Sequence, residues 1–160
     1  MISGSELVDT WSSIYSNSAA VRSALAFTHI AGLVGGGGCA IAADRTTLRA
    51  FRKGADALDR ELHHLHNVHL VVIVGLTLVI GSGLLLMLSD LDAYLSAGVF
   101  WVKMALVVAL LANGFLVMRG ARRTHAGDAR GPALLKFAAI ASLTLWFGTT
   151  LLGAVLPNAL

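Results

Sequence analysis

Hydrophobic residues in this chain occur in long runs rather than in the alternating or one-faced patterns of a water-soluble domain. Four stretches, 23–43, 62–89, 93–118 and 137–160, carry no charge except for Lys103 in the third. A helix needs about 20 apolar residues to cross a hydrocarbon core of about 30 Å, whereas a barrel strand needs about half as many. The pattern predicts an all-α integral membrane four-helix bundle, with spans at about 23–43, 64–89, 97–118 and 135–156.

The composition excludes an ordinary soluble domain. Hydrophobic residues make up 56% of the 160 residues and charged residues 13%, where about a quarter charged is usual. The net charge of +3 does not indicate a nucleic-acid partner, because the basic residues lie between apolar stretches and form no continuous basic helix. The single cysteine, Cys39, excludes an internal disulfide and an all-cysteine metal site. The partner that the composition implies is a lipid bilayer.

The positions of the basic residues predict the orientation in the membrane. Ten of the 12 Lys and Arg residues lie in two links, 44–61 and 119–136. The positive-inside rule places both links in the cytoplasm, and the N-terminus, the turn at 90–92 and the C-terminus on the non-cytoplasmic side. We therefore expect a multi-pass protein of the bacterial inner membrane.

The first 22 residues differ from the rest of the chain. They have neither the basic start nor the apolar core of a cleaved signal peptide. We interpret 1–22 as an external segment, a short interfacial helix anchored by Leu7, Trp11, Ile14 and Tyr15. Residues 23–160 then form the domain of four transmembrane helices.

A histidine and a row of small residues share one face of the first predicted span. At 100° per residue His29, Gly32, Gly36, Ala40 and Ala43 fall on one stripe. One interpretation is close packing against a neighbouring helix. The other is that Gly32 and Gly36 leave room for a haem b macrocycle whose iron His29 ligates.

Depth along the helices relates the polar residues of different spans. His29 and Lys103 each lie sixteen residues before the arginine that ends their span, or about 24 Å from the cytoplasmic boundary. His69 lies only about 13 Å from that boundary. We therefore expect Lys103 to share the depth of His29, and His69 not to be the second axial ligand of an iron bound to His29.

Three further histidine positions suggest a different chemistry. His63, His66 and His69 follow one another at i, i+3 steps. Imidazoles so spaced bind copper, zinc or iron when another helix completes the shell. The alternative is that His63, His64 and His66 are polar residues at the membrane interface and only His69 is buried.

The remaining candidates lie at the ends of the spans. Lys103 either snorkels to the external interface or pairs with a buried anion such as a haem propionate. Trp101 is a candidate cofactor contact, with a position in the interfacial aromatic belt as the alternative. Asp44 and Arg45 are predicted to form a boundary ion pair, with Arg45 also available to a propionate.

These residues resemble a known group. His29 in AFTHIAGLVGGG, the pair Asp44–Arg45, and Lys103 in FWVKMALVVALLANG are similar to positions in small bacterial four-helix membrane proteins, namely the HemJ-type protoporphyrinogen IX oxidases and the CopD-like copper-resistance domains. The resemblance covers about residues 23–118. It implies b-type haem binding that involves His29 and Lys103.

Three functions are consistent with the sequence. The first is a haem b membrane protein acting in electron transfer or as an oxidoreductase. The second is a protein that binds or transports copper or zinc through the His63–His69 cluster. The third is a cofactor-free structural or assembly subunit of a membrane complex. These functions imply one of three kinds of partner: a redox partner, a larger membrane complex, or further copies of the chain in a homo-oligomer.

Overall fold

The chain folds into long helices that run the length of the molecule. The computed structural model describes residues 3–160, apart from the side chains at positions 55, 56, 59–61 and 63–67. Every regular element in this part of the chain is helical. The elements are α1 (Gly4–Asn17), α2 (Ala19–Gly32), η1 (Leu33–Gly37), α3 (Gly38–Lys53), α4 (Ala55–Ser89), α5 (Leu91–Ser96), α6 (Gly98–His125), α7 (Gly131–Val155) and η2 (Leu156–Asn158).

Four helical segments are long and apolar enough to cross a membrane. They are Ala19–Lys53, Val68–Ser89, Gly98–His125 and Gly131–Asn158. The prediction of an all-helical chain with four such helices is therefore confirmed. The first segment continues ten residues beyond the predicted end of its span, because α2, η1 and α3 form one continuous helix through the polar residues that follow the apolar run.

Two glycine turns lie at one end of the bundle, which we call the arginine-rich end. Gly54, between α3 and α4, has φ 106°, and Gly127, between α6 and α7, has φ 74°. Only glycine adopts such angles without strain, so these residues end the preceding helices. Pro132 then lies in the first turn of α7, where a missing N–H costs nothing.

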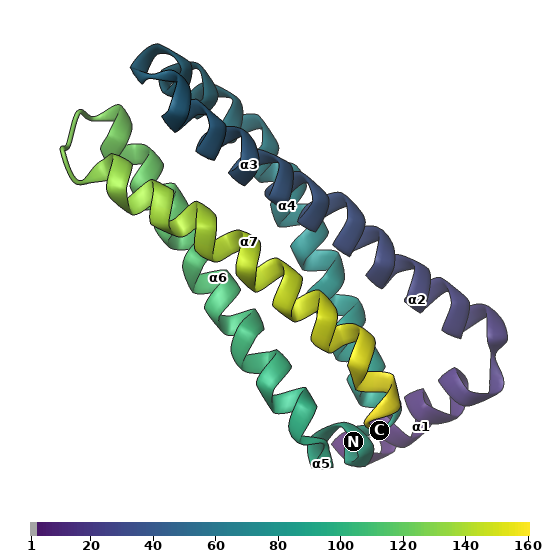
Figure 1. The fold of residues 1–160 in the computed structure, drawn as a ribbon. Helices are drawn as coiled ribbons and strands as arrows, with labels where there is room; N and C mark the ends of the chain where they lie inside the picture. Colours follow the sequence, from purple (N-terminus) through teal and green to yellow (C-terminus); the bar gives the residue numbers. More distant parts are fainter. Residues whose placement is uncertain (1–2) are drawn as a thin grey trace.

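Both termini lie at the opposite end, which we call the terminal end (Figure 1). Here α1 has no buried residue, but two of its side chains bind the end of α4. The Trp11 Nε1–H donates to the Leu85 carbonyl at 2.8 Å, and the Ser12 hydroxyl donates to the Ser89 carbonyl at 2.8 Å. The predicted N-terminal segment thus contains a helix that is fastened to the bundle.

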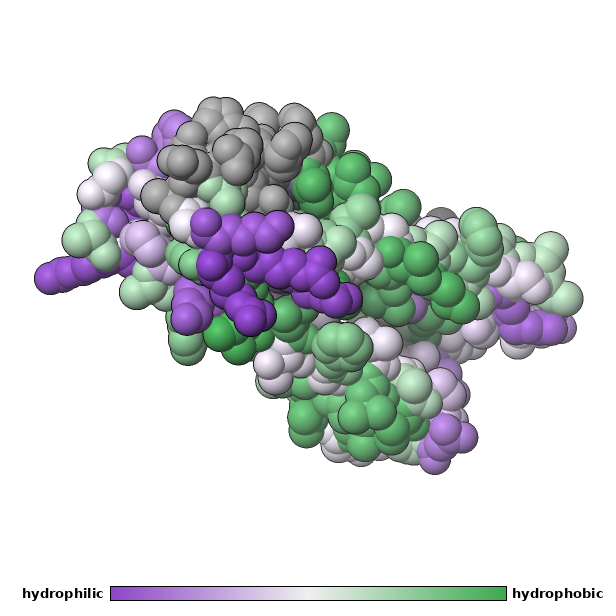
Figure 2. Space-filling view, turned by 45° about the horizontal axis from the view of Figure 1, so that its top comes forward, coloured by the Kyte–Doolittle hydropathy of each residue, from purple (hydrophilic) through white to green (hydrophobic). Residues whose placement is uncertain are grey.

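The long helices pack as two pairs. The continuous helix α2–η1–α3 packs along α4, α6 packs along α7, and the pairs meet mainly through α3 and α7 (Figure 1). Figure 2, in which the top of the molecule is turned toward the viewer, shows a cluster of hydrophilic residues left of the centre and hydrophobic residues to the right of and below it. This distribution is that of a bundle whose outer surface faces lipid.

Glycines create a very close contact between α2–η1 and α4. A β-carbon on Gly32 would lie 2.8 Å from the carbonyl oxygen of Gly75, and one on Gly36 would lie 2.8 Å from the Gly75 Cα. The backbones of α2–η1 and α4 therefore touch without intervening side chains, as in other membrane contacts between small residues.

This contact predicts the effect of a single methyl group. Gly75→Ala places a β-carbon against the Gly36 backbone, so the two helices must separate, and we expect a loss of about 1–3 kcal/mol of stability. Thermal unfolding in a neutral maltoside detergent measures the loss. Gly81→Ala is the matched control on the same helix, because nothing lies within 4 Å of its new β-carbon. Equal melting temperatures for the two variants would contradict the contact.

Candidate functional site

Ser82 of α4 orients the ring of His29. The Nδ1 atom of His29 lies 2.9 Å from the Ser82 hydroxyl oxygen, and the Ser82 hydroxyl donates its proton to the Leu78 carbonyl of its own helix. Because the hydroxyl has only one proton, its oxygen accepts from His29 Nδ1–H when the ring is neutral. The lone pair of the neutral ring is then on Nε2, which is the form in which imidazole binds a metal.

Lys103 lies at the same level of the bundle as His29. The Lys103 ammonium is close enough to the His29 ring to interact with it electrostatically, and Lys103 Nζ would lie 3.4 Å from a β-carbon on Gly153 of α7. The predicted shared depth of His29 and Lys103 is therefore confirmed. Within the described part of the chain no carboxylate forms an ion pair with Lys103. We call His29, Ser82 and Lys103 the histidine–lysine site.

Gly32 and Gly36 do not leave room beside His29. The Gly75 backbone occupies the space next to both residues. Of the two interpretations of the small-residue stripe, close helix packing describes these two glycines.

Trp101 lies outside the histidine–lysine site. Its side chain is 57% exposed, and its Nε1–H donates to the Leu95 carbonyl at 3.0 Å. The preceding residue, Phe100, is buried and packs edge-on against Tyr94, with ring centroids 5.8 Å apart. Trp101 therefore anchors the turn between α5 and α6 at the molecular surface, a position typical of the interfacial aromatic belt.

The prediction that Asp44 and Arg45 form a boundary ion pair is wrong. Asp44 is 5% exposed and lies beside Ser142 of α7, whereas Arg45 is exposed. Neighbouring residues of a helix point about 100° apart. Asp44 therefore lies on the face of α3 that packs against α7, and Arg45 lies outside that face. Arg45 is consequently not part of the interior near His29.

A cavity lies at the level of Asp44, between α3, α4, α6 and α7. Its volume is about 290 Å³, and most of its wall is apolar. The polar residues on the wall are Asp44, His69 and Ser142. We call this space the Asp44 cavity. Sequence reasoning missed it, although Asp44 follows Gly36 and Ala40 at i+4 steps and so continues the inward stripe of the first span.

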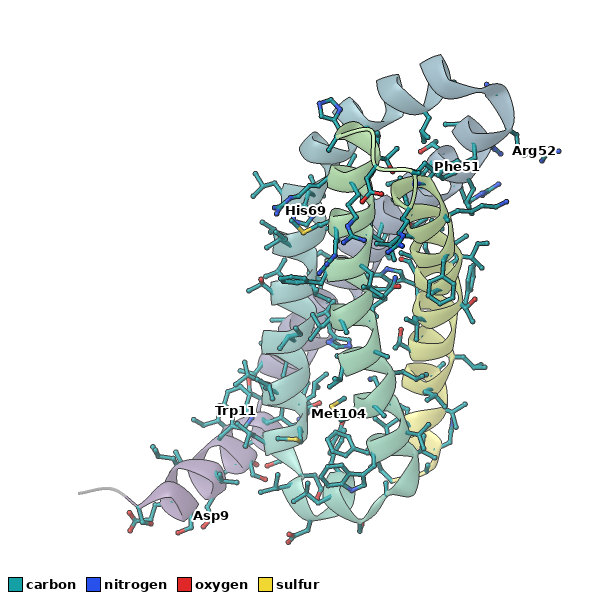
Figure 3. All side chains as sticks on the ribbon, turned by 90° about the vertical axis from the view of Figure 1, so that its left-hand side faces the viewer. Asp9, Trp11, Phe51, Arg52, His69 and Met104 are labelled. Carbon is teal, nitrogen blue, oxygen red and sulfur yellow. The ribbon has the colours of Figure 1, made fainter. Side chains whose placement is uncertain are left out.

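His69 is far from His29 in depth. Ser82, which contacts His29, lies 13 residues after His69 on α4, and this spacing corresponds to about 20 Å along a helix. Figure 3 shows His69 toward the arginine-rich end and Met104, the neighbour of Lys103, toward the terminal end. The two histidines therefore cannot bind one iron from opposite faces, as the sequence predicted, and their separation is larger than the expected 10 Å or so.

The predicted metal cluster cannot be assembled from what the structure describes. The side chains of His63 and His66 lie outside the described residues. Among the residues that are described, no group of three His, Cys, Asp or Glu side chains is placed to hold a metal ion. Of the three histidines, His69 is the one that the structure describes, and it lies on the wall of the Asp44 cavity.

Asn113 connects the second helix pair. It is buried, and its Nδ2–H donates to the Ala138 carbonyl of α7 at 2.9 Å. Hydrogen bonds between membrane helices contribute about 0.6 kcal/mol on average and up to about 1.7 kcal/mol.

The cross-helix bond of Asn113 gives a second prediction. Asn113→Ala should lower the unfolding free energy in detergent by about 1 kcal/mol, because α6 and α7 lose their side-chain connection. Thr144→Ala is the control, since Thr144 donates only within α7 and is exposed. A larger loss in Thr144→Ala than in Asn113→Ala would show that Asn113 does not stabilise the pair.

No protein-family model, curated protein or solved structure matches this chain. Its function therefore has to be inferred from its own residues.

Proposed function

We propose that this protein is a b-type haem-binding integral membrane protein, acting in electron transfer or as an oxidoreductase, with His29 as an axial ligand. The observation that carries the proposal is the hydrogen bond between His29 Nδ1 and Ser82. It selects the neutral ring with a free lone pair on Nε2, and ligating histidines are commonly held by such a bond through the other nitrogen.

The unpaired ammonium of Lys103 supports an anionic group in the same place. A charged lysine inside a membrane bundle requires a compensating partner, and no described carboxylate supplies one. A haem propionate has the required charge. Lys103 would bind that propionate, while His29 binds the iron.

The space for the haem macrocycle lies elsewhere than the sequence predicted. The Gly32 and Gly36 side of α2 is occupied by α4. In Figure 1, α2 diverges from α7 toward the terminal end. The His29 imidazole and the Lys103 ammonium are groups that bind haem iron and a propionate, respectively, and this supports our proposal of a haem between the pairs rather than over the glycines.

Each residue of the site then has a defined task. The bound haem supplies one-electron redox chemistry. His29 would donate its Nε2 lone pair to the iron, Ser82 would hold the ring in the required tautomer, and Lys103 would neutralise a propionate. A redox partner would complete the electron path.

We further propose that the arginine-rich end faces the cytoplasm of a bacterial inner membrane, with both termini on the other side. The support is the concentration of ten of the 12 basic residues in the two links at this end, together with the positive-inside rule.

Cysteine labelling tests this orientation. In a Cys39→Ser background, a cysteine introduced by Arg123→Cys should be protected from a membrane-impermeant thiol reagent in intact cells, whereas one introduced by Asp9→Cys should react. Permeabilised cells provide the control, in which both cysteines react. The reverse pattern in intact cells would overturn the orientation.

Optical spectroscopy tests the haem. Wild-type protein produced with ample haem should show a Soret band that is lost in His29→Ala. Ser82→Ala should keep the band but bind haem about 10–100-fold more weakly, the usual cost of losing such a supporting bond. His69→Ala should keep it fully, because His69 lies about 20 Å away along α4. A colourless wild-type protein, or equal spectra for wild type and His29→Ala, would overturn the proposal.

A further inference from the structure

The Asp44 carboxylate has an unusual environment for a buried charge. Asp44 is 5% exposed. One of its oxygens, Oδ2, has no hydrogen-bond partner in the described part of the chain, and Ser142 lies beside the carboxylate on the same cavity wall. Leaving a buried carboxylate with an unsatisfied oxygen costs several kcal/mol of desolvation, so a residue of this kind inside a membrane bundle indicates a functional site.

The described protein groups do not neutralise this charge. The ion pair among the described residues joins Arg123 and Asp128, 3.7 Å apart, and Arg45 points outward. Asp44 instead stands on the wall of the cavity. A carboxyl group in this position is neutralised either by its own proton or by a positively charged occupant of the cavity, and the cavity provides the space for such an occupant.

The lining indicates what kind of cation fits. A volume of about 290 Å³ is near the lower end of the range for small-molecule sites, about 300–1,000 Å³, and is far larger than a bare ion. The polar wall residues are one carboxylate, one imidazole and one hydroxyl, fewer ligands than a tetrahedral metal site needs. Trp146 also lines the cavity, and an indole ring attracts organic cations to its face.

The mouth of the cavity opens toward lipid. Three of its wall residues, Ile73 of α4 with Leu111 and Phe115 of α6, are exposed hydrophobic side chains, and Phe115 is 78% exposed. An occupant that enters here has to pass through the apolar surface of the bundle. An apolar body is thus favoured as well as a positive charge.

We propose that the Asp44 cavity is a binding site for a small lipophilic ammonium ion, with Asp44 as the counter-ion and Trp146 against the cationic group. His69 provides an imidazole nitrogen on the same wall. This site is separate from the histidine–lysine site, so the inference does not rest on haem binding. A haem propionate is excluded from it, because the carboxylate of Asp44 repels an anion.

Fluorescence of Trp146 measures the binding. Trp11→Phe together with Trp101→Phe leaves Trp146 as the sole tryptophan, and the protein is kept in a neutral maltoside detergent. Benzyltrimethylammonium is the probe, because its charge does not depend on pH. Neopentylbenzene, its neutral isostere, is the matched control ligand. We expect saturable quenching by the cation and at least about tenfold weaker binding of the neutral compound, since a charge-assisted contact contributes about 1.5–3 kcal/mol.

Variants assign the effect to the carboxylate. Asp44→Asn should weaken binding of the cation at least about tenfold while leaving that of the neutral isostere unchanged. Asp128→Asn, a partly exposed carboxylate at the same end, should bind as the parent does, and so should His29→Ala. Ala43→Leu, which fills the cavity wall and keeps Asp44, should abolish binding and serves as a second test if Asp44→Asn does not fold.

Three results would overturn the inference. They are the absence of saturable quenching by the cation, equal affinity for the cation and its neutral isostere, and equal weakening by Asp44→Asn and Asp128→Asn. The last two would show, respectively, a merely apolar cavity and a general effect of negative charge at the arginine-rich end.

Discussion

The backbone contact of Gly32 and Gly36 with Gly75 is the constraint on which the rest of the bundle depends. It holds the first long helix against α4 at a distance that side chains would forbid. One turn away from this contact, His29 meets Ser82. The π-helical turn η1 contains both Gly36, which faces α4, and the next residue, Gly37, which faces the Trp146 ring of α7. One glycine-rich turn therefore joins the two helix pairs.

The two sites have charges of opposite sign at opposite halves of the bundle. Near the terminal end, Lys103 brings a positive charge that no described carboxylate pairs. Near the arginine-rich end, Asp44 brings a carboxylate with an unsatisfied oxygen. In the low dielectric of a bilayer such charges interact strongly with any ligand of the opposite sign. The terminal half is thus suited to an anionic group and the arginine-rich half to a cationic one.

Three sequence interpretations depended on which way a side chain points, and they had different outcomes. His29 was expected to face the interior, and it does so because the small residues on its stripe pack against α4. Asp44 was interpreted as a boundary residue, but it continues the inward-facing stripe of the first span and faces α7. Trp101, a candidate cofactor contact, is turned outward by its bond to the Leu95 carbonyl.

The sequence by itself determined the number of spanning helices, their approximate limits and the common depth of His29 and Lys103. These properties follow from the length of each apolar run and from a fixed rise per residue, which depend on local chemistry alone. Only the tertiary structure decided that Ser82 holds His29, that Gly75 fills the space beside the glycines, and that Asp44 opens into a cavity. Those features arise where residues distant in the chain meet. The sequence of one helix does not specify which face of another helix it will contact.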